Sequence, residues 1–154
     1  MSGHQSDARI SFMVDPLAML ALATLVVNDR WLKPNLRNAL TGKLSDLALC
    51  CLLPLFFAEI ASLCALHADQ RRLLNLAACA AAVIFTVLEL SVTAARWACS
   101  GLALLGPWLG IHGPFVMTRD ATDLLALPMV LLAVAWGRHK ISQGVKGSDA
   151  HMVD

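Results

Sequence analysis

The chain has 154 residues, of which 58% are hydrophobic and 15% are charged, and its mean hydropathy is +0.66. Soluble domains are typically about 45–50% apolar and about 25% charged, so this composition excludes an ordinary soluble domain and indicates an integral membrane protein. The 12 basic and 11 acidic residues leave a net charge of +1, which excludes the strongly basic surface expected of a nucleic-acid-binding protein.

The first apolar segment follows a polar N-terminal tail that we assign to residues 1–14. Asp15 followed by Pro16 is typical of a helix start, because Asp accepts hydrogen bonds from free backbone N–H groups and Pro has no N–H to leave unpaired. We expect this helix to run from about Pro16 to Leu32. No small-residue cleavage site follows it, so we interpret it as a membrane span and not as a removed signal peptide.

Two longer apolar segments come next, each at least as long as the roughly 17–25 residues that a span requires. After a polar link over Lys33–Gly42, the second span is expected over Leu44–Leu66, with a kink at Pro54. The polar turn HADQRR after it is short. The third span, expected over Leu73–Ala98, is therefore predicted to be the antiparallel neighbour of the second.

The segment Cys99–Met117 is apolar but contains four glycines and two prolines, so it is not expected to cross the bilayer as one regular helix. We predict a re-entrant or interfacial segment there. The fourth span is expected over Thr122–Trp136, followed by a polar C-terminal tail over 138–154. The predicted fold is an all-α polytopic membrane protein, with four transmembrane helices in a domain of residues 15–137.

Polar residues gather at one predicted membrane face. If the four spans alternate in direction, one side of the membrane holds the ends of the first and third spans and the starts of the second and fourth. The polar residues at these ends are Asn28, Asp29, Lys43, Ser45, Asp46, Glu89, Arg96, Arg119, Asp120, Thr122 and Asp123, with His112 in the irregular segment on that face. Ionisable groups in membrane segments are costly and usually mark a functional cavity, so these residues predict a shared pocket.

The residue types in this set suggest its chemistry. Asp46, Asp120 and Asp123 are the candidate catalytic residues, acting as acid or base groups or as oxygen ligands of a divalent cation, which is a candidate cofactor. The candidate substrate-binding residues are Asn28, Asp29, Lys43, Arg96, His112 and Arg119. Lys43 and Arg119 are expected to hold an anion such as a phosphate. Alternatively, the same aspartates at helix starts serve only as N-terminal caps.

Three sequence segments carry a resemblance: VVNDRWLK at 26–33, TGKLSD at 41–46 and TRDATDLLALP at 118–128. They resemble an uncharacterised group of small bacterial four-helix membrane proteins with an Asn-Asp pair closing the first span and a Thr-Gly-Lys-Leu-Ser-Asp segment opening the second. More distantly, the layout is similar to that of VanZ-like membrane proteins. That resemblance implies a small helical bundle with a polar membrane face that acts on lipid headgroups or lipid-linked carriers.

The sequence leaves three functions open. The leading interpretation is a headgroup-level pocket that binds or processes a membrane lipid headgroup or a lipid-linked anionic substrate. The second is a transporter or channel-like protein, in which Asp46, Glu59 and Glu89 form a relay at different depths. The third is a non-catalytic structural or effector subunit of a membrane assembly.

The expected location is a bacterial inner membrane, crossed several times. Positive charge does not settle the orientation, because six basic residues fall on each side of a four-span arrangement. We expect both termini in the cytoplasm, since several basic residues on the other side belong to the predicted pocket.

Overall fold

The computed structural model describes residues 10–36, 39–65, 68–109 and 120–150. These residues are mainly helical and contain no β-strand, which confirms the all-α prediction. The elements in chain order are α1 (Pro16–Val27), η1 (Asn28–Leu32), α2 (Lys33–Leu36), α3 (Ala39–Cys64), α4 (Gln70–Leu90), α5 (Val92–Leu105), η2 (Gly106–Leu109), η3 (Ala121–Ala126) and α6 (Pro128–Ala150).

Helix α1 starts as the sequence predicts. Asp15 has extended backbone angles, and its carboxylate accepts a hydrogen bond from the backbone N–H of Leu17 at 2.9 Å. The helix then passes through the π-helical turn η1 directly into α2, so the chain coils without a break from Pro16 to Leu36. Part of the predicted polar link is therefore helical, and α3 begins at Ala39, five residues before the predicted start of the second span.

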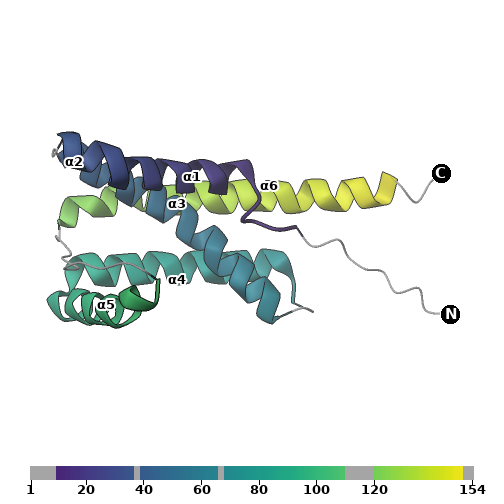
Figure 1. Ribbon diagram of the computed structural model, residues 1–154. Helices are drawn as coiled ribbons and strands as arrows, with labels where there is room; N and C mark the ends of the chain where they lie inside the picture. The colour runs from purple at the N-terminus through teal and green to yellow at the C-terminus, as the bar shows by residue number, and fades with distance from the viewer. Residues whose placement is uncertain (1–9, 37–38, 66–67, 110–119, 151–154) are drawn as a thin grey trace.

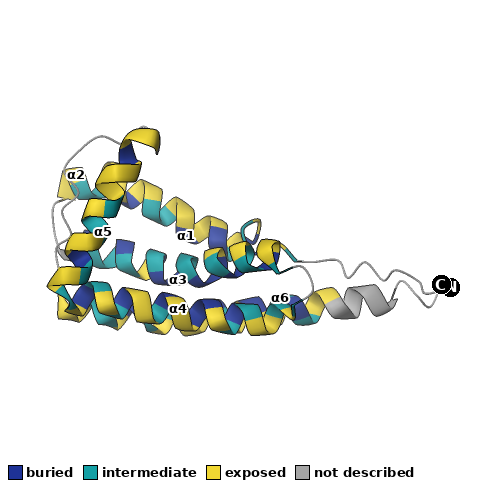
Figure 2. Cartoon of the chain, turned by 90° about the horizontal axis from the view of Figure 1, so that it is seen from below, coloured by how far each residue is buried: buried dark blue, intermediate teal, exposed yellow. Residues whose placement is uncertain are grey.

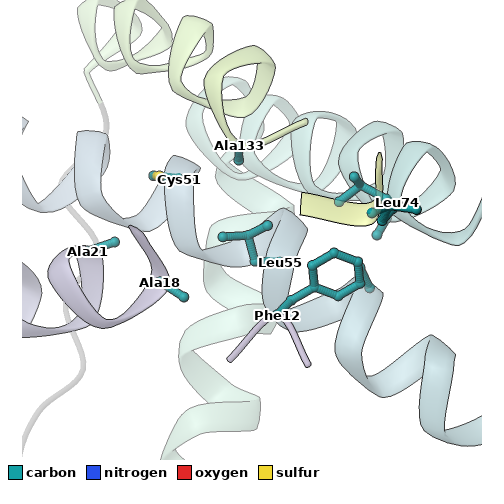
Figure 3. Packing of buried hydrophobic residues seen from close by; sticks show 10 residues of the cluster. Phe12, Ala18, Ala21, Cys51, Leu55, Leu74 and Ala133 are labelled. Carbon is teal, nitrogen blue, oxygen red and sulfur yellow. The ribbon is translucent and has the colours of Figure 1, made fainter. Parts of the chain in front are cut away.

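The long helices form a bundle around α3, which packs against α1, α4 and α6, while α4 also packs against α6 (Figure 1). Pro54 lies inside α3 and its side chain is buried. One core cluster unites α1, α3, α4 and α6 through Ala18, Leu55, Leu74 and Ala133 (Figure 3).

Three helical segments are long and apolar enough to cross a membrane: Leu40–Cys64, Gln70–Leu90 and Ala121–Gly144. Most of the buried hydrophobic residues are Ala or Cys, whereas many large apolar side chains, such as Leu131 and Leu76, lie on the outside (Figure 2). Small residues at helix contacts are typical of helix packing in lipid. Such a large exposed apolar surface is unusual for a soluble monomer.

The predicted third span, Leu73–Ala98, is wrong at its C-terminal end. Helix α4 stops at Leu90, because Ser91 adopts extended backbone angles and its side chain caps a new helix by accepting a hydrogen bond from the backbone N–H of Ala94 at 3.2 Å. Helix α5 then lies across one end of the bundle (Figures 1 and 2). The predicted irregular segment is regular helix as far as Leu105, and its residues 110–117 lie outside the described chain.

The fourth predicted span also differs from the structure. The 3₁₀-helix η3 comes first, and Pro128 opens α6 instead of interrupting a helix, since Pro fits the first helical turn. Helix α6 continues to Ala150, well beyond the predicted end at Trp136. It approaches α4 closely at Gly137, where an added Cβ would lie 2.6 Å from Leu74 Cδ2.

Candidate functional site

Four helical segments bring their polar residues together at one end of the bundle, the end at which α2, η3 and the α4–α5 junction lie in Figure 1. We call this the site end and define it by the polar residues that its contacts connect: Asn28, Asp29, Lys43, Ser45, Asp46, Glu89, Asp120, Thr122 and Asp123. The convergence expected from alternating spans is present for all of these residues.

The first group of contacts joins η1 to the start of α3. The fully buried Asn28 donates from Nδ2 to the backbone oxygen of Thr41 at 2.5 Å and to Ser45 Oγ at 2.7 Å. Ser45 Oγ in turn donates to Asp29 Oδ1 at 2.8 Å, and Lys33 Nζ lies 2.7 Å from the same carboxylate oxygen. Asn28 and Asp29 therefore hold the end of the first helical segment against the TGKLSD segment.

The second group of contacts centres on Lys43. Its ammonium donates to Thr122 Oγ1 at 2.5 Å and to Asp123 Oδ1 at 3.1 Å, and lies 3.9 Å from Asp120 Oδ2. Lys43 and its partners are about 80 residues apart in sequence, so this ion pair fixes η3 to the start of α3. Because Asp123 already neutralises it, Lys43 is a weaker anion-binding group than the sequence suggested.

Asp120 acts as the N-terminal cap of η3. Its side chain accepts a hydrogen bond from the backbone N–H of Thr122 at 2.9 Å. Hydrogen bonds from Thr122, with the nearby Lys43 ammonium, hold the pKa of the exposed Asp120 carboxyl below its ordinary value. The backbone N–H of Asp120 donates to Glu89 Oε2 at 3.3 Å, which ties η3 to the end of α4. The structure thus gives Asp120 the capping role that the sequence left as an alternative.

Asp46 differs from the other carboxylates at the site end. Its side chain is only partly buried, and within the described residues it forms no hydrogen bond and no close ion pair. It interacts electrostatically with the carboxylates of Asp123 and Glu89 and, in the opposite sense, with the ammonium groups of Lys33 and Lys43. It also lines a cavity of about 80 Å³, together with Lys43, Leu47, Thr122, Asp123, Leu125 and Ala126. Among the described residues, the Asp46 carboxylate therefore borders this cavity without a hydrogen-bond partner.

A divalent cation site does not form among the described residues. No group of three or more His, Cys, Asp or Glu side chains there is close enough to hold a metal ion. In particular, Asp29 is engaged by Ser45 and Lys33, while Asp123 is engaged by Lys43.

Arg96 is not part of this cluster. The sequence predicts one continuous helix with Arg96 seven residues, or two turns, after Glu89. The helix instead breaks at Ser91, so Arg96 lies on α5. There it lines a separate open hollow with Thr93, Trp97 and Ser100. His112 and Arg119, the remaining predicted binding residues, lie outside the residues that the structure describes.

The opposite end of the bundle carries a second set of polar contacts. Glu59 accepts hydrogen bonds from the backbone N–H of Phe12 at 2.6 Å and from Ser11 Oγ at 3.0 Å. Asp15 accepts from Trp136 Nε1 at 2.6 Å and lies 3.2 Å from Lys140 Nζ. The sequence predicts Asp15 only as a cap, because nothing local indicates a partner more than 120 residues away.

The chain matches no protein-family model, no curated protein and no solved structure.

Proposed function

We propose that this chain is a multi-pass integral membrane protein whose site end lies at one membrane surface and binds the headgroup of a membrane lipid. The observation that carries the proposal is Asp46, a carboxylate without a hydrogen-bond partner among the described residues, facing a cavity at the end of a bundle of apolar helices. The proposal concerns binding, with Asp46 and Asp123 as the carboxylates that meet the headgroup.

The dimensions of the helices support the membrane placement. At about 1.5 Å per residue, the 21 residues of α4 extend about 31 Å, close to the roughly 30 Å hydrocarbon core of a bilayer. We take the continuous coil from Pro16 to Leu36 as a fourth crossing, beside the three longer segments. By analogy with the bacterial proteins that the sequence resembles, we place the protein in a bacterial inner membrane with cytoplasmic termini.

The acidic side chains of the site end favour the amine or hydroxyl part of a headgroup over its phosphate. Among the described residues that the site-end contacts connect, the acidic side chains outnumber the two paired lysines, Lys33 and Lys43. A phosphate would be repelled there, whereas an ammonium or hydroxyl group would donate hydrogen bonds to Asp46. The cavity admits a few water molecules or one group of similar size. We therefore assign it to the terminal amine or hydroxyl of a phospholipid headgroup.

Native mass spectrometry of the purified protein with added phospholipids tests this assignment. We expect phosphatidylethanolamine or phosphatidylglycerol to bind in preference to phosphatidylcholine, which has no terminal N–H or O–H. Replacing Asp46 with Asn should weaken that preference about tenfold, the size of a lost charged hydrogen bond. The matched control is Asp69→Asn, an exposed cap of α4 that binds the backbone N–H of Arg71. Unchanged lipid preference in folded Asp46→Asn protein would refute the assignment.

A second candidate function is a purely structural subunit, and the capping by Asp120 and the ion pair of Lys43 favour it. It differs from headgroup binding in giving no role to Asp46, so the same experiment separates the two. The relay interpretation receives less support. Glu59 lies 13 residues, about 20 Å, along α3 from Asp46, and it is engaged by Phe12 and Ser11.

A further inference from the structure

Helix α5 has an orientation that sets it apart from the bundle. It follows α4 after the single non-helical residue Ser91, yet it lies across the bundle where the other long helices run along it (Figures 1 and 2). If α4 crosses the bilayer, as proposed above, a helix that turns sharply at its end lies in the plane of the membrane surface. This places α5 at the same surface as the site end.

The side of α5 that meets the bundle is made of small residues. Ala95 is buried, and Ala94 and Ala98 are partly buried, in a helix whose main packing partner is α4. The remaining surface exposes large apolar side chains: Trp97 is 75% exposed, and Trp108 in the following η2 turn is 89% exposed. Water would hydrate these indoles poorly, whereas tryptophan is enriched at the boundary between headgroups and hydrocarbon.

A polar stripe also runs along α5. Thr93, Arg96 and Ser100 are spaced three and four residues apart, which puts them on one helix face. With Trp97 they line the open hollow described above, whose volume is about 320 Å³. Arg96 is exposed and forms no ion pair with any residue in the described ranges. Within the described ranges, the Arg96 guanidinium and the hydroxyls of Thr93 and Ser100 are therefore hydrogen-bond donors without an acidic partner.

We infer that α5 is an interfacial helix whose Arg96 stripe binds the phosphate of an anionic membrane phospholipid. Guanidinium groups bind phosphate oxygens in a bidentate manner, and the hydroxyls of Thr93 and Ser100 add further donors. Trp97 and Trp108 hold the helix at the depth of the ester groups, where phospholipid phosphates are within reach. This inference rests on the proposed membrane placement, and it supplies the phosphate contact that the acidic cavity lacks.

Fluorescence quenching by brominated phospholipids tests the depth of α5. Two single-tryptophan proteins in vesicles are compared, one keeping Trp97 and the other keeping Trp136 on α6, with the remaining tryptophans replaced by Phe. We expect Trp97 to be quenched more strongly by bromine near the glycerol backbone than by bromine near the chain ends. The inference would be overturned if bromine near the chain ends quenched Trp97 more strongly. It would also be overturned if Trp97 were not quenched at all while Trp136 was. If neither tryptophan is quenched, the membrane placement itself is wrong.

The phosphate contact is tested in the same Trp97 protein. Brominated phosphatidylglycerol and brominated phosphatidylcholine are compared at a low proportion in unlabelled phosphatidylcholine vesicles. We expect local enrichment of the anionic lipid around Trp97, and Arg96→Gln should reduce it about fivefold, the equivalent of roughly 1 kcal/mol per basic residue at an anionic surface. The control Arg72→Gln removes an exposed cation from the start of α4 and should leave the enrichment unchanged. Equal enrichment with and without the Arg96 guanidinium would overturn the phosphate assignment.

Discussion

The two ends of the bundle use acidic residues in different ways. At the opposite end, Asp15 and Glu59 are engaged by backbone N–H groups, Trp136 and Lys140, so their charges fasten the N-terminal segment and α6 to the core. At the site end, Asp46 has no such partner within the described part of the chain, and it lines a cavity together with Asp123. A satisfied buried carboxylate stabilises a fold, whereas an unsatisfied one lowers its stability. This contrast supports the proposed role of Asp46 in binding.

The largest expected effect is at the opposite end. Asp15→Ala removes the cap of α1 and leaves Trp136 Nε1 and the Lys140 ammonium without their acceptor. We expect the free energy of unfolding to fall by about 3 kcal/mol, from the lost cap and the lost charged hydrogen bonds. Denaturant unfolding in detergent micelles, followed by circular dichroism, measures it. A loss no larger than that of Asp46→Ala would remove the contrast between the two ends.

Helix packing near the opposite end should be almost as sensitive. In Gly137→Ala the new methyl group would lie 2.6 Å from Leu74 Cδ2, so the fully buried Leu74 side chain would have to shift within the core. We expect a loss of about 2 kcal/mol from overpacking. Gly42→Ala is the matched control, because nothing lies within 4 Å of its added Cβ and Ala favours helix. The packing interpretation predicts that only the first substitution lowers the unfolding temperature.

Asp15 should also make the fold sensitive to acid. Burial alone would raise the pKa of Asp15, but hydrogen bonds from Leu17, Trp136 and Lys140 outweigh it and lower the pKa below 3.8. Its contribution is therefore complete above the unfolded-state pKa and is lost as the pH falls through the lower folded-state value. Unfolding curves between pH 6 and about pH 2 should show this loss, and Asp15→Asn should reduce it. An identical acid profile in the variant would contradict this role.

A smaller effect is expected for the cap at the site end. Asp120→Ala should lower the free energy of unfolding by about 1 kcal/mol, because the backbone N–H of Thr122 loses its acceptor. Asp120→Asn should be nearly neutral, since Asn caps helices as well as Asp does. If both substitutions cost the same, the charge of Asp120 matters more than its hydrogen bond.

The smallest stability effect is expected for Asp46→Asn, the substitution with the largest expected effect on lipid binding. Removing its charge relieves the cost of partial burial and the repulsion from Asp123 and Glu89, which outweigh the attraction to Lys33 and Lys43, and it breaks no hydrogen bond within the described chain. We expect the unfolding midpoint to stay the same or rise slightly. A clear loss of stability would mean that Asp46 holds the fold, as Asp15 does.

Some features of this fold follow from the sequence and others do not. The Asp15–Pro16 start and the long apolar segments rest on local composition, and the structure confirms both. The break at Ser91 was missed, because Leu90 and Val92 continue the apolar run and one Ser in it gives little sign of a helix end. The convergence of Asn28, Lys43 and Asp123 follows from alternating helix direction, but the pairing of Lys43 with Asp123 depends on the geometry of η3.

The central claim is that the bundle crosses the bilayer with the site end at one surface. Its most direct test is to label the two ends of the bundle from each side of a membrane. Single cysteines replace Asp29 and Thr122 at the site end, and Arg71 and Ser142 at the opposite end, in a chain whose five native cysteines are changed to alanine. In sealed vesicles of known orientation, a membrane-impermeant maleimide should label positions 29 and 122 from one side and positions 71 and 142 from the other. Labelling of all four positions from the same side would contradict a bundle that crosses the bilayer with its lipid site at one surface.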